Sequence, residues 1–136
     1  MADSPLIIKS KEFALQIIQV CNFIKQNKKE SVLTNQLIRS GTSVGANIRE
    51  AFYGHGTADF IAKLQIALKE CSESEYWLEL LIESGIYDNR DILDKCIEVK
   101  KLLSHNRFCR CATVRISAIN RRFKSNIIKY ITCYHR

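Results

Sequence analysis

Residues that break helices are almost absent from this chain. Its 136 residues contain a single proline, Pro5, and only five glycines. Proline and glycine are the residues that most often interrupt or end a helix, so a chain this poor in both favours long helices. The length suffices for one domain with a hydrophobic core of its own. The sequence therefore predicts an all-helical protein.

Apolar residues recur with a period near 3.6 in four segments, which is the pattern of amphipathic helices. These segments cover approximately residues 9–26, 35–53, 58–84 and the stretch that begins near residue 89. Thr34 and Thr57 stand just before the second and third segments and are the predicted N-caps. Short connections between long amphipathic helices favour antiparallel neighbours. The predicted fold is all-α, an antiparallel up-down-up-down four-helix bundle with a basic C-terminal extension.

Charge divides the chain into two parts. Residues 1–104 contain 13 Lys and Arg against 14 Asp and Glu, whereas residues 105–136 contain eight basic residues and no acidic one. We therefore predict a four-helix bundle domain over 1–104. The basic segment 105–136 either continues the fourth helix or forms an amphipathic helix. Such a segment favours an RNA partner. The candidate RNA-binding residues are Arg107, Arg110, Arg115, Arg121, Arg122, Lys124 and Lys129.

The second helical segment contains several small residues, including Gly41, Ser43 and Gly45. A glycine inside a helix costs about 1 kcal/mol relative to alanine, so some other interaction must offset it. Close approach of another helix is the favoured explanation. A phosphate-binding loop is the alternative, but it would need these glycines before a helix rather than within one.

Polar residues in the same segment share one helical face. Arg39, Ser43, Asn47 and Glu50 follow one another at spacings of four, four and three. Glutamates at 70, 73 and 75 in the third segment are their candidate partners. A polar network at a helix–helix or subunit interface is favoured over a ligand site, because buried polar groups need partners in any case.

Residues that could carry catalysis form no recognisable pattern. Helical bundles that hold two metal ions use Glu-x-x-His pairs, and this sequence contains none. Cys21, Cys71 and Cys96 occupy apolar positions and are expected to be buried thiols. Four residues of the C-terminal segment could supply zinc ligands, although their spacing matches no standard zinc finger: Cys109, Cys111, Cys133 and His135. We expect no enzymatic activity and no cofactor.

The sequence offers no segment suited to membrane insertion. No apolar run approaches the ~20 residues that a spanning helix needs. The N-terminus lacks the basic region followed by an apolar stretch that marks a secretory signal. We therefore expect a cytoplasmic protein without integral membrane association.

Three parts of the sequence resemble a known family. They are Ser10–Leu15 in the first segment, Leu37–Ala51 in the second, and the motifs Asp59–Leu64, Ile66–Glu70 and Glu75–Leu81 in the third. With these motifs, residues 5–104 resemble the small bacterial proteins named after the intervening sequences of 23S ribosomal RNA genes, also described as four-helix bundle proteins. The chain departs from the family's pattern after about Ser104. The C-terminal segment is therefore either a basic extension or an out-of-frame end.

The resemblance implies a four-helix bundle that assembles into a closed ring, typically a pentamer, with no catalytic residues. The leading hypothesis is a non-enzymatic, ring-forming bundle that binds structured RNA or a nucleoprotein through the basic segment. The alternative is a protein-interaction scaffold with no role in nucleic-acid binding. A third possibility makes the C-terminal segment a membrane-surface helix, since Ile127, Ile128 and Ile131 lie beside basic residues.

Overall fold

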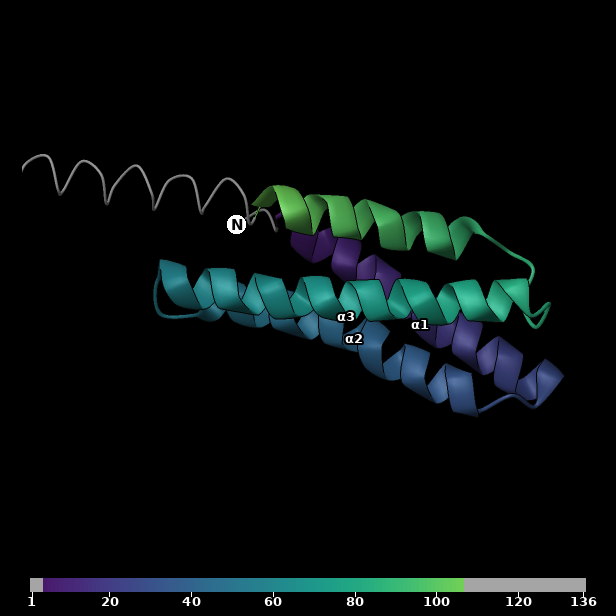
Figure 1. The fold of residues 1–136 in the computed structure, drawn as a ribbon. Helices are drawn as coiled ribbons and strands as arrows, with labels where there is room; N and C mark the ends of the chain where they lie inside the picture. Colours follow the sequence, from purple (N-terminus) through teal and green to yellow (C-terminus); the bar gives the residue numbers. More distant parts are fainter. Residues whose placement is uncertain (1–3, 107–136) are drawn as a thin grey trace, which may run out of the picture.

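The structure is a computed structural model that describes residues 4–106. Helices α1 (Pro5–Lys28), α2 (Val32–Tyr53) and α3 (Thr57–Glu83) follow one another with short connections. A fourth helix comprises residues 91–106, where the described part of the chain ends (Figure 1). Residues 4–106 contain no β-strand. The predicted all-α four-helix bundle is confirmed, and the fourth helix extends past the predicted domain boundary at residue 104.

Three predicted helix starts were wrong. Helix α1 begins at Pro5 because proline lacks an N–H and suits the first helical turn. Helix α2 begins at Val32, and Thr34 lies buried inside its first turn instead of capping it. The carboxylate of Glu30 takes over the capping role, because it accepts the backbone N–H groups of Leu33 at 2.7 Å and Thr34 at 3.1 Å. Thr57 is likewise the first residue of α3 rather than its cap.

The helices form a bundle in which chain neighbours are also neighbours in space. Helix α2 packs against both α1 and α3, whereas no Cα atom of α1 lies within 8 Å of one in α3. The fourth helix closes the bundle between them (Figure 1). It meets α3 where Cys96 Sγ lies 3.7 Å from Cys71 Sγ, and it meets α1 where Lys9 Nζ lies 3.6 Å from Glu98 Oε1. Helices α1 and α3 therefore occupy opposite corners of the bundle.

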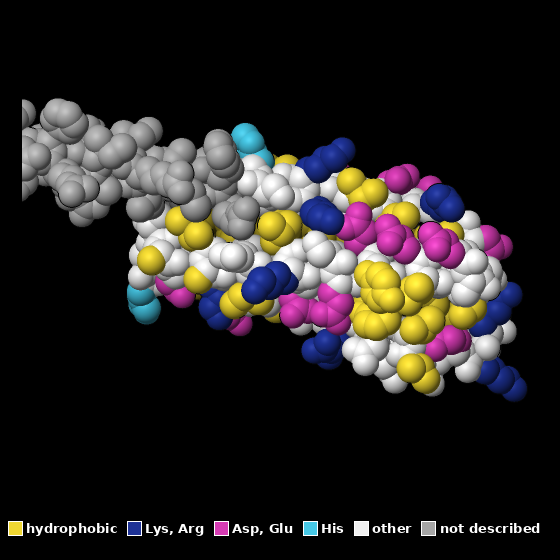
Figure 2. All heavy atoms as spheres, viewed as in Figure 1, with side chains coloured by type: hydrophobic (Ala, Val, Ile, Leu, Met, Phe, Trp, Pro, Cys, Tyr) yellow, Lys and Arg dark blue, Asp and Glu magenta, His cyan; other side chains and the backbone are white. Residues whose placement is uncertain are grey.

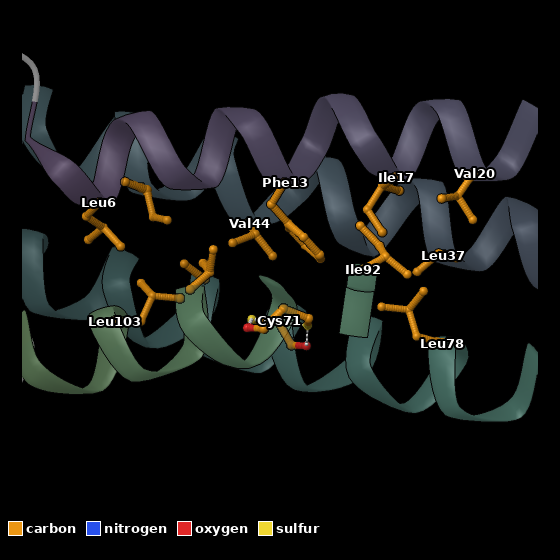
Figure 3. Packing of buried hydrophobic residues seen from close by; sticks show 14 of the residues in the cluster. Leu6, Phe13, Ile17, Val20, Leu37, Val44, Cys71, Leu78, Ile92 and Leu103 are labelled. Carbon is orange, nitrogen blue, oxygen red and sulfur yellow. Dashed lines mark hydrogen bonds between the residues drawn. The ribbon is translucent and has the colours of Figure 1, made fainter. Parts of the chain in front are cut away.

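All four helices contribute to one continuous hydrophobic core (Figure 3). Phe13 and Ile17 of α1 point toward the middle of the bundle and are fully covered, with Val44 behind them on α2. Leu78 of α3 and Ile92 of the fourth helix lie across the core from Ile17. Burial of this set supplies the main favourable term for folding, because each large apolar side chain contributes about 1.5–3 kcal/mol.

Candidate functional site

The small residues of α2 lie where α2 crosses α1. A Cβ atom added to Gly41 would lie 2.9 Å from Cγ2 of Ile17, which is closer than carbon atoms pack. At Gly45 the nearest atom would be the Ser10 carbonyl oxygen at 3.6 Å, an ordinary contact. Gly41 is therefore the residue that permits the close approach of α1. Gly45 lies at a looser point of the same crossing.

A shallow groove of about 380 Å³ runs along the outer side of this crossing. Small and apolar side chains form most of its floor, and the cations Lys11 of α1 and Arg49 of α2 belong to its lining. Its other lining residues are Ile7, Ser10, Ala14, Thr42, Gly45 and Ala46. We call this set the α1–α2 groove. It is a hollow between two helices with positive charge at its sides.

Two of the four polar residues predicted to share a face of α2 contact α3 at the seam between the two helices. Arg39 Nη2 lies 3.0 Å from Glu73 Oε1, and the same carboxylate oxygen accepts the indole N–H of Trp77 at 3.2 Å. Farther along the seam, Lys63 of α3 donates a hydrogen bond to Glu50, and that bond raises the pKa of Lys63. The predicted face of α2 thus meets α3 at its two ends, Arg39 and Glu50.

Other residues predicted for this network make different contacts. Asn47 donates to the Ser43 carbonyl at 2.9 Å, a bond within α2 itself. Glu75 turns away from α2 and accepts a hydrogen bond from Lys100 of the fourth helix. Glu70 makes neither contact, and its buried Oε2 atom has no hydrogen-bond partner among the described residues.

A buried serine pair at the same seam was missed by the sequence reasoning. Ser74 Oγ lies 2.9 Å from Ser40 Oγ and 2.8 Å from the Glu70 carbonyl oxygen, and both serine side chains are fully buried. The available signal was their position, because each serine occupies a core position in the apolar pattern of its helix. Such a pair gives the α2–α3 contact a polar bond inside a dry interior.

The described cysteines are buried thiols, as predicted. Burial raises the pKa of Cys21 from 9.0 to about 11. The pKa of Cys96 is raised as well, first by its hydrogen bond with Cys71 and then by burial. Thiols in this state are neutral and covered, whereas nucleophilic chemistry requires an accessible thiolate.

The described residues hold no group of three or more His, Cys, Asp or Glu side chains placed to bind a metal ion. Over the same part of the chain, every helix is too short or too polar to cross a bilayer. The zinc-ligand candidates lie outside the described residues, at 109, 111, 133 and 135. The seven candidate RNA-binding residues, from Arg107 to Lys129, also lie outside them.

An apolar patch lies on the surface over the C-terminal half of α3, next to acidic side chains (Figure 2). Tyr76 is 53% exposed, and its ring centre lies 5.1 Å from that of Trp77. Helix α1 exposes apolar side chains as well, with Leu15 at 53% and Ile8 at 45%. Contiguous exposed apolar patches are common at contact surfaces between proteins, whereas apolar side chains exposed singly are ordinary.

Comparisons with known proteins agree with this architecture. The family model of the 23S rRNA-intervening sequence protein matches residues 3–105. A crystal structure from Bacteroides thetaiotaomicron, of a protein with unknown function from the S23 ribosomal protein family, is 46% identical. That match has a TM-score of 0.74 and covers 75% of this chain and 97% of the other. No curated protein matches the sequence. The chain belongs to the family of 23S rRNA-intervening sequence proteins.

Proposed function

We propose that this protein is a non-catalytic helical scaffold that assembles into a closed homo-oligomeric ring. The observation that carries the proposal is the exposure of large apolar side chains on helices whose inner faces already fill a core. Tyr76 and Leu15 are each 53% exposed, on helices at opposite corners of the bundle. Contact with further copies of the chain would remove these apolar side chains from water, which is favourable. The family resemblance favours five subunits.

Sedimentation velocity of the full chain over a concentration series tests the assembly. The proposal predicts one species whose mass is an integer multiple of 15.7 kDa, with five as the expected multiple. It also predicts that this mass stays constant over the series, because a closed ring has no free face for further growth. A species of 15.7 kDa at every concentration would contradict the proposal.

Binding of structured RNA is a second candidate function, and the charge distribution favours it. Residues 105–136 contain eight basic residues and no acidic one, whereas residues 1–104 carry a net charge of −1. A ring would repeat this basic segment once per subunit. Contacts between cations and phosphates release counterions, so such binding weakens steeply as salt increases.

The RNA proposal is tested with the full chain and with residues 1–106, each titrated with a structured RNA across a salt series. We expect binding by the full chain only, with a slope of log affinity against log salt that reflects several phosphate contacts per subunit. Equal binding by both proteins, or none by either, would refute a role for the basic segment.

We also propose a cytoplasmic location, which the three free cysteines of the described region support.

A further inference from the structure

Opposite charges lie on the two helices at opposite corners of the bundle. Helix α1 carries four lysines and one glutamate, whereas α3 carries six acidic residues and two lysines. Some of these charges pair with other helices of the subunit, as Lys9 does with Glu98 and Glu73 with Arg39, but no salt bridge joins α1 to α3 among residues 4–106. The subunit therefore has a basic side and an acidic side.

The acidic side carries a ridge on α3. Tyr76, Glu79, Leu80 and Glu83 follow one another at helical spacings of three, one and three, so they share one face. Tyr76, Glu79 and Glu83 are exposed, and Leu80 is half-buried. Neither glutamate forms a salt bridge within residues 4–106. We call these four residues the α3 ridge, an apolar strip with two free carboxylates.

The basic side carries the α1–α2 groove. Lys11 and Arg49 are exposed and form no salt bridge with any described residue. Ile8 and Leu15 flank Lys11 on α1 at spacings of three and four, and both are exposed. The groove and its border thus combine apolar surface with two free cations. This composition is complementary in charge to the α3 ridge.

We propose that the α3 ridge of one copy docks into the α1–α2 groove of a second copy. Glu79 and Glu83 would face Lys11 and Arg49, while the Tyr76 ring would cover apolar surface beside the groove. The two surfaces lie on different sides of one subunit, so the contact is head-to-tail. Repeating this contact closes a ring when the rotation that relates one copy to the next divides a full turn evenly. This inference rests on the proposed ring and specifies which surfaces form it.

Charge complementarity selects a second copy over other occupants. An unrelated protein could cover either surface alone, but the subunit itself presents both halves of a matched pair. In a head-to-tail assembly every copy uses both halves, and none of the four charges named above stays unpaired. Interfaces of this kind tolerate few like-charge contacts, because each one weakens association strongly.

Charge reversal in the full chain tests the proposal. One variant changes the groove (Lys11→Glu with Arg49→Glu), a second changes the ridge (Glu79→Lys with Glu83→Lys), and a third combines all four substitutions. A matched control reverses two exposed lysines of the fourth helix, Lys95→Glu with Lys101→Glu. Circular dichroism and thermal unfolding establish that each variant is folded, and sedimentation measures its mass.

We expect each of the two single-face variants to associate roughly 100-fold more weakly than the wild-type chain. The four-substitution variant should assemble again, because its charges are reversed but still complementary. An equimolar mixture of the two single-face variants should also associate. The control should assemble like the wild-type chain.

Two results would overturn the proposal in different ways. If the wild-type chain assembles and both single-face variants assemble equally well, the ring exists but uses other surfaces. If only one single-face variant dissociates, its surface binds something other than the matching surface proposed here. A monomeric wild-type chain would refute the ring itself, and with it this interface.

Discussion

Replacing Gly41 by alanine tests how tightly α1 and α2 pack. Alanine favours a helix over glycine by about 1 kcal/mol, so the substitution would stabilise an uncrowded site. At this position, however, the new Cβ would lie 2.9 Å and 3.0 Å from the two γ-carbons of Ile17. Ile17 is fully buried, so it can move only by displacing other core side chains. Overpacking of this kind costs about 1–3 kcal/mol, and we expect a net loss of up to ~2 kcal/mol.

Gly45→Ala provides a matched control one helical turn away. Its added Cβ would meet the Ser10 carbonyl oxygen at 3.6 Å and no side-chain or backbone atom closer than that. The propensity gain then has no steric cost to oppose it. We expect Gly45→Ala to raise the free energy of unfolding by roughly 0.5–1 kcal/mol. The two substitutions should therefore act with opposite signs.

The assay is urea-induced unfolding followed by circular dichroism, with the free energy taken by linear extrapolation. Each protein is measured at several concentrations, because self-association makes apparent stability depend on concentration. We expect the urea midpoint of Gly41→Ala to lie below that of the wild-type chain and the midpoint of Gly45→Ala to lie above it. A Gly41→Ala protein at least as stable as the wild type would refute the claim of close packing against Ile17.

Three further predictions concern buried or bridging groups. Burial raises the pKa of Cys21 from 9.0 to about 11, so its contribution to stability is complete below pH 9 and falls by about 2–3 kcal/mol as the pH rises to 11. Urea unfolding across this pH range should therefore show that the free energy of unfolding declines less steeply for Cys21→Ala than for the wild-type chain. Ser40→Ala and Ser74→Ala should each cost about 1 kcal/mol, and the double substitution should cost clearly less than their sum, because the bond between the two serines can be lost only once. In each single variant the remaining hydroxyl keeps a backbone acceptor, the Leu37 or the Glu70 carbonyl oxygen. Additive costs in the same assay would contradict the hydrogen bond between the serines. Lys100→Met should lower the free energy of unfolding by at most about 1 kcal/mol, because the Lys100 side chain is 36% exposed. Thermal unfolding should show a smaller loss of stability at high salt, because salt screens the ion pair with Glu75. A loss that does not depend on salt would indicate packing instead of the ion pair.

Periodicity predicted the helices well because each one buries a single apolar stripe. It placed helix starts less accurately, since these depend on which group satisfies the first N–H donors. At α2 that group is the Glu30 carboxylate, which accepts the N–H groups three and four residues later in the chain. A serine or threonine cap accepts N–H groups two or three residues later. The apolar pattern contains no information about this choice.

The polar residues of the candidate site were only partly predictable. Spacing placed Arg39 and Glu50 on one face of α2, but it could not say that Glu73 and Lys63 would be their partners. Glu75 shows why, because a shift of two residues along α3 turns its side chain toward the fourth helix and Lys100. Partner choice depends on the rotation of each helix about its own axis, and packing sets that rotation.

Cross-linking between isotopically distinct copies of the full chain tests the proposed interface between copies. Equal amounts of 14N-labelled and 15N-labelled protein are assembled together and treated with a carbodiimide, which joins lysine to a touching carboxylate. The intrasubunit pairs Lys63–Glu50 and Lys100–Glu75 serve as internal controls and should appear only within one isotope. The proposed interface predicts mixed-isotope links from Lys11 to Glu79 or Glu83. Control links without any mixed-isotope link between α1 and α3 would contradict it.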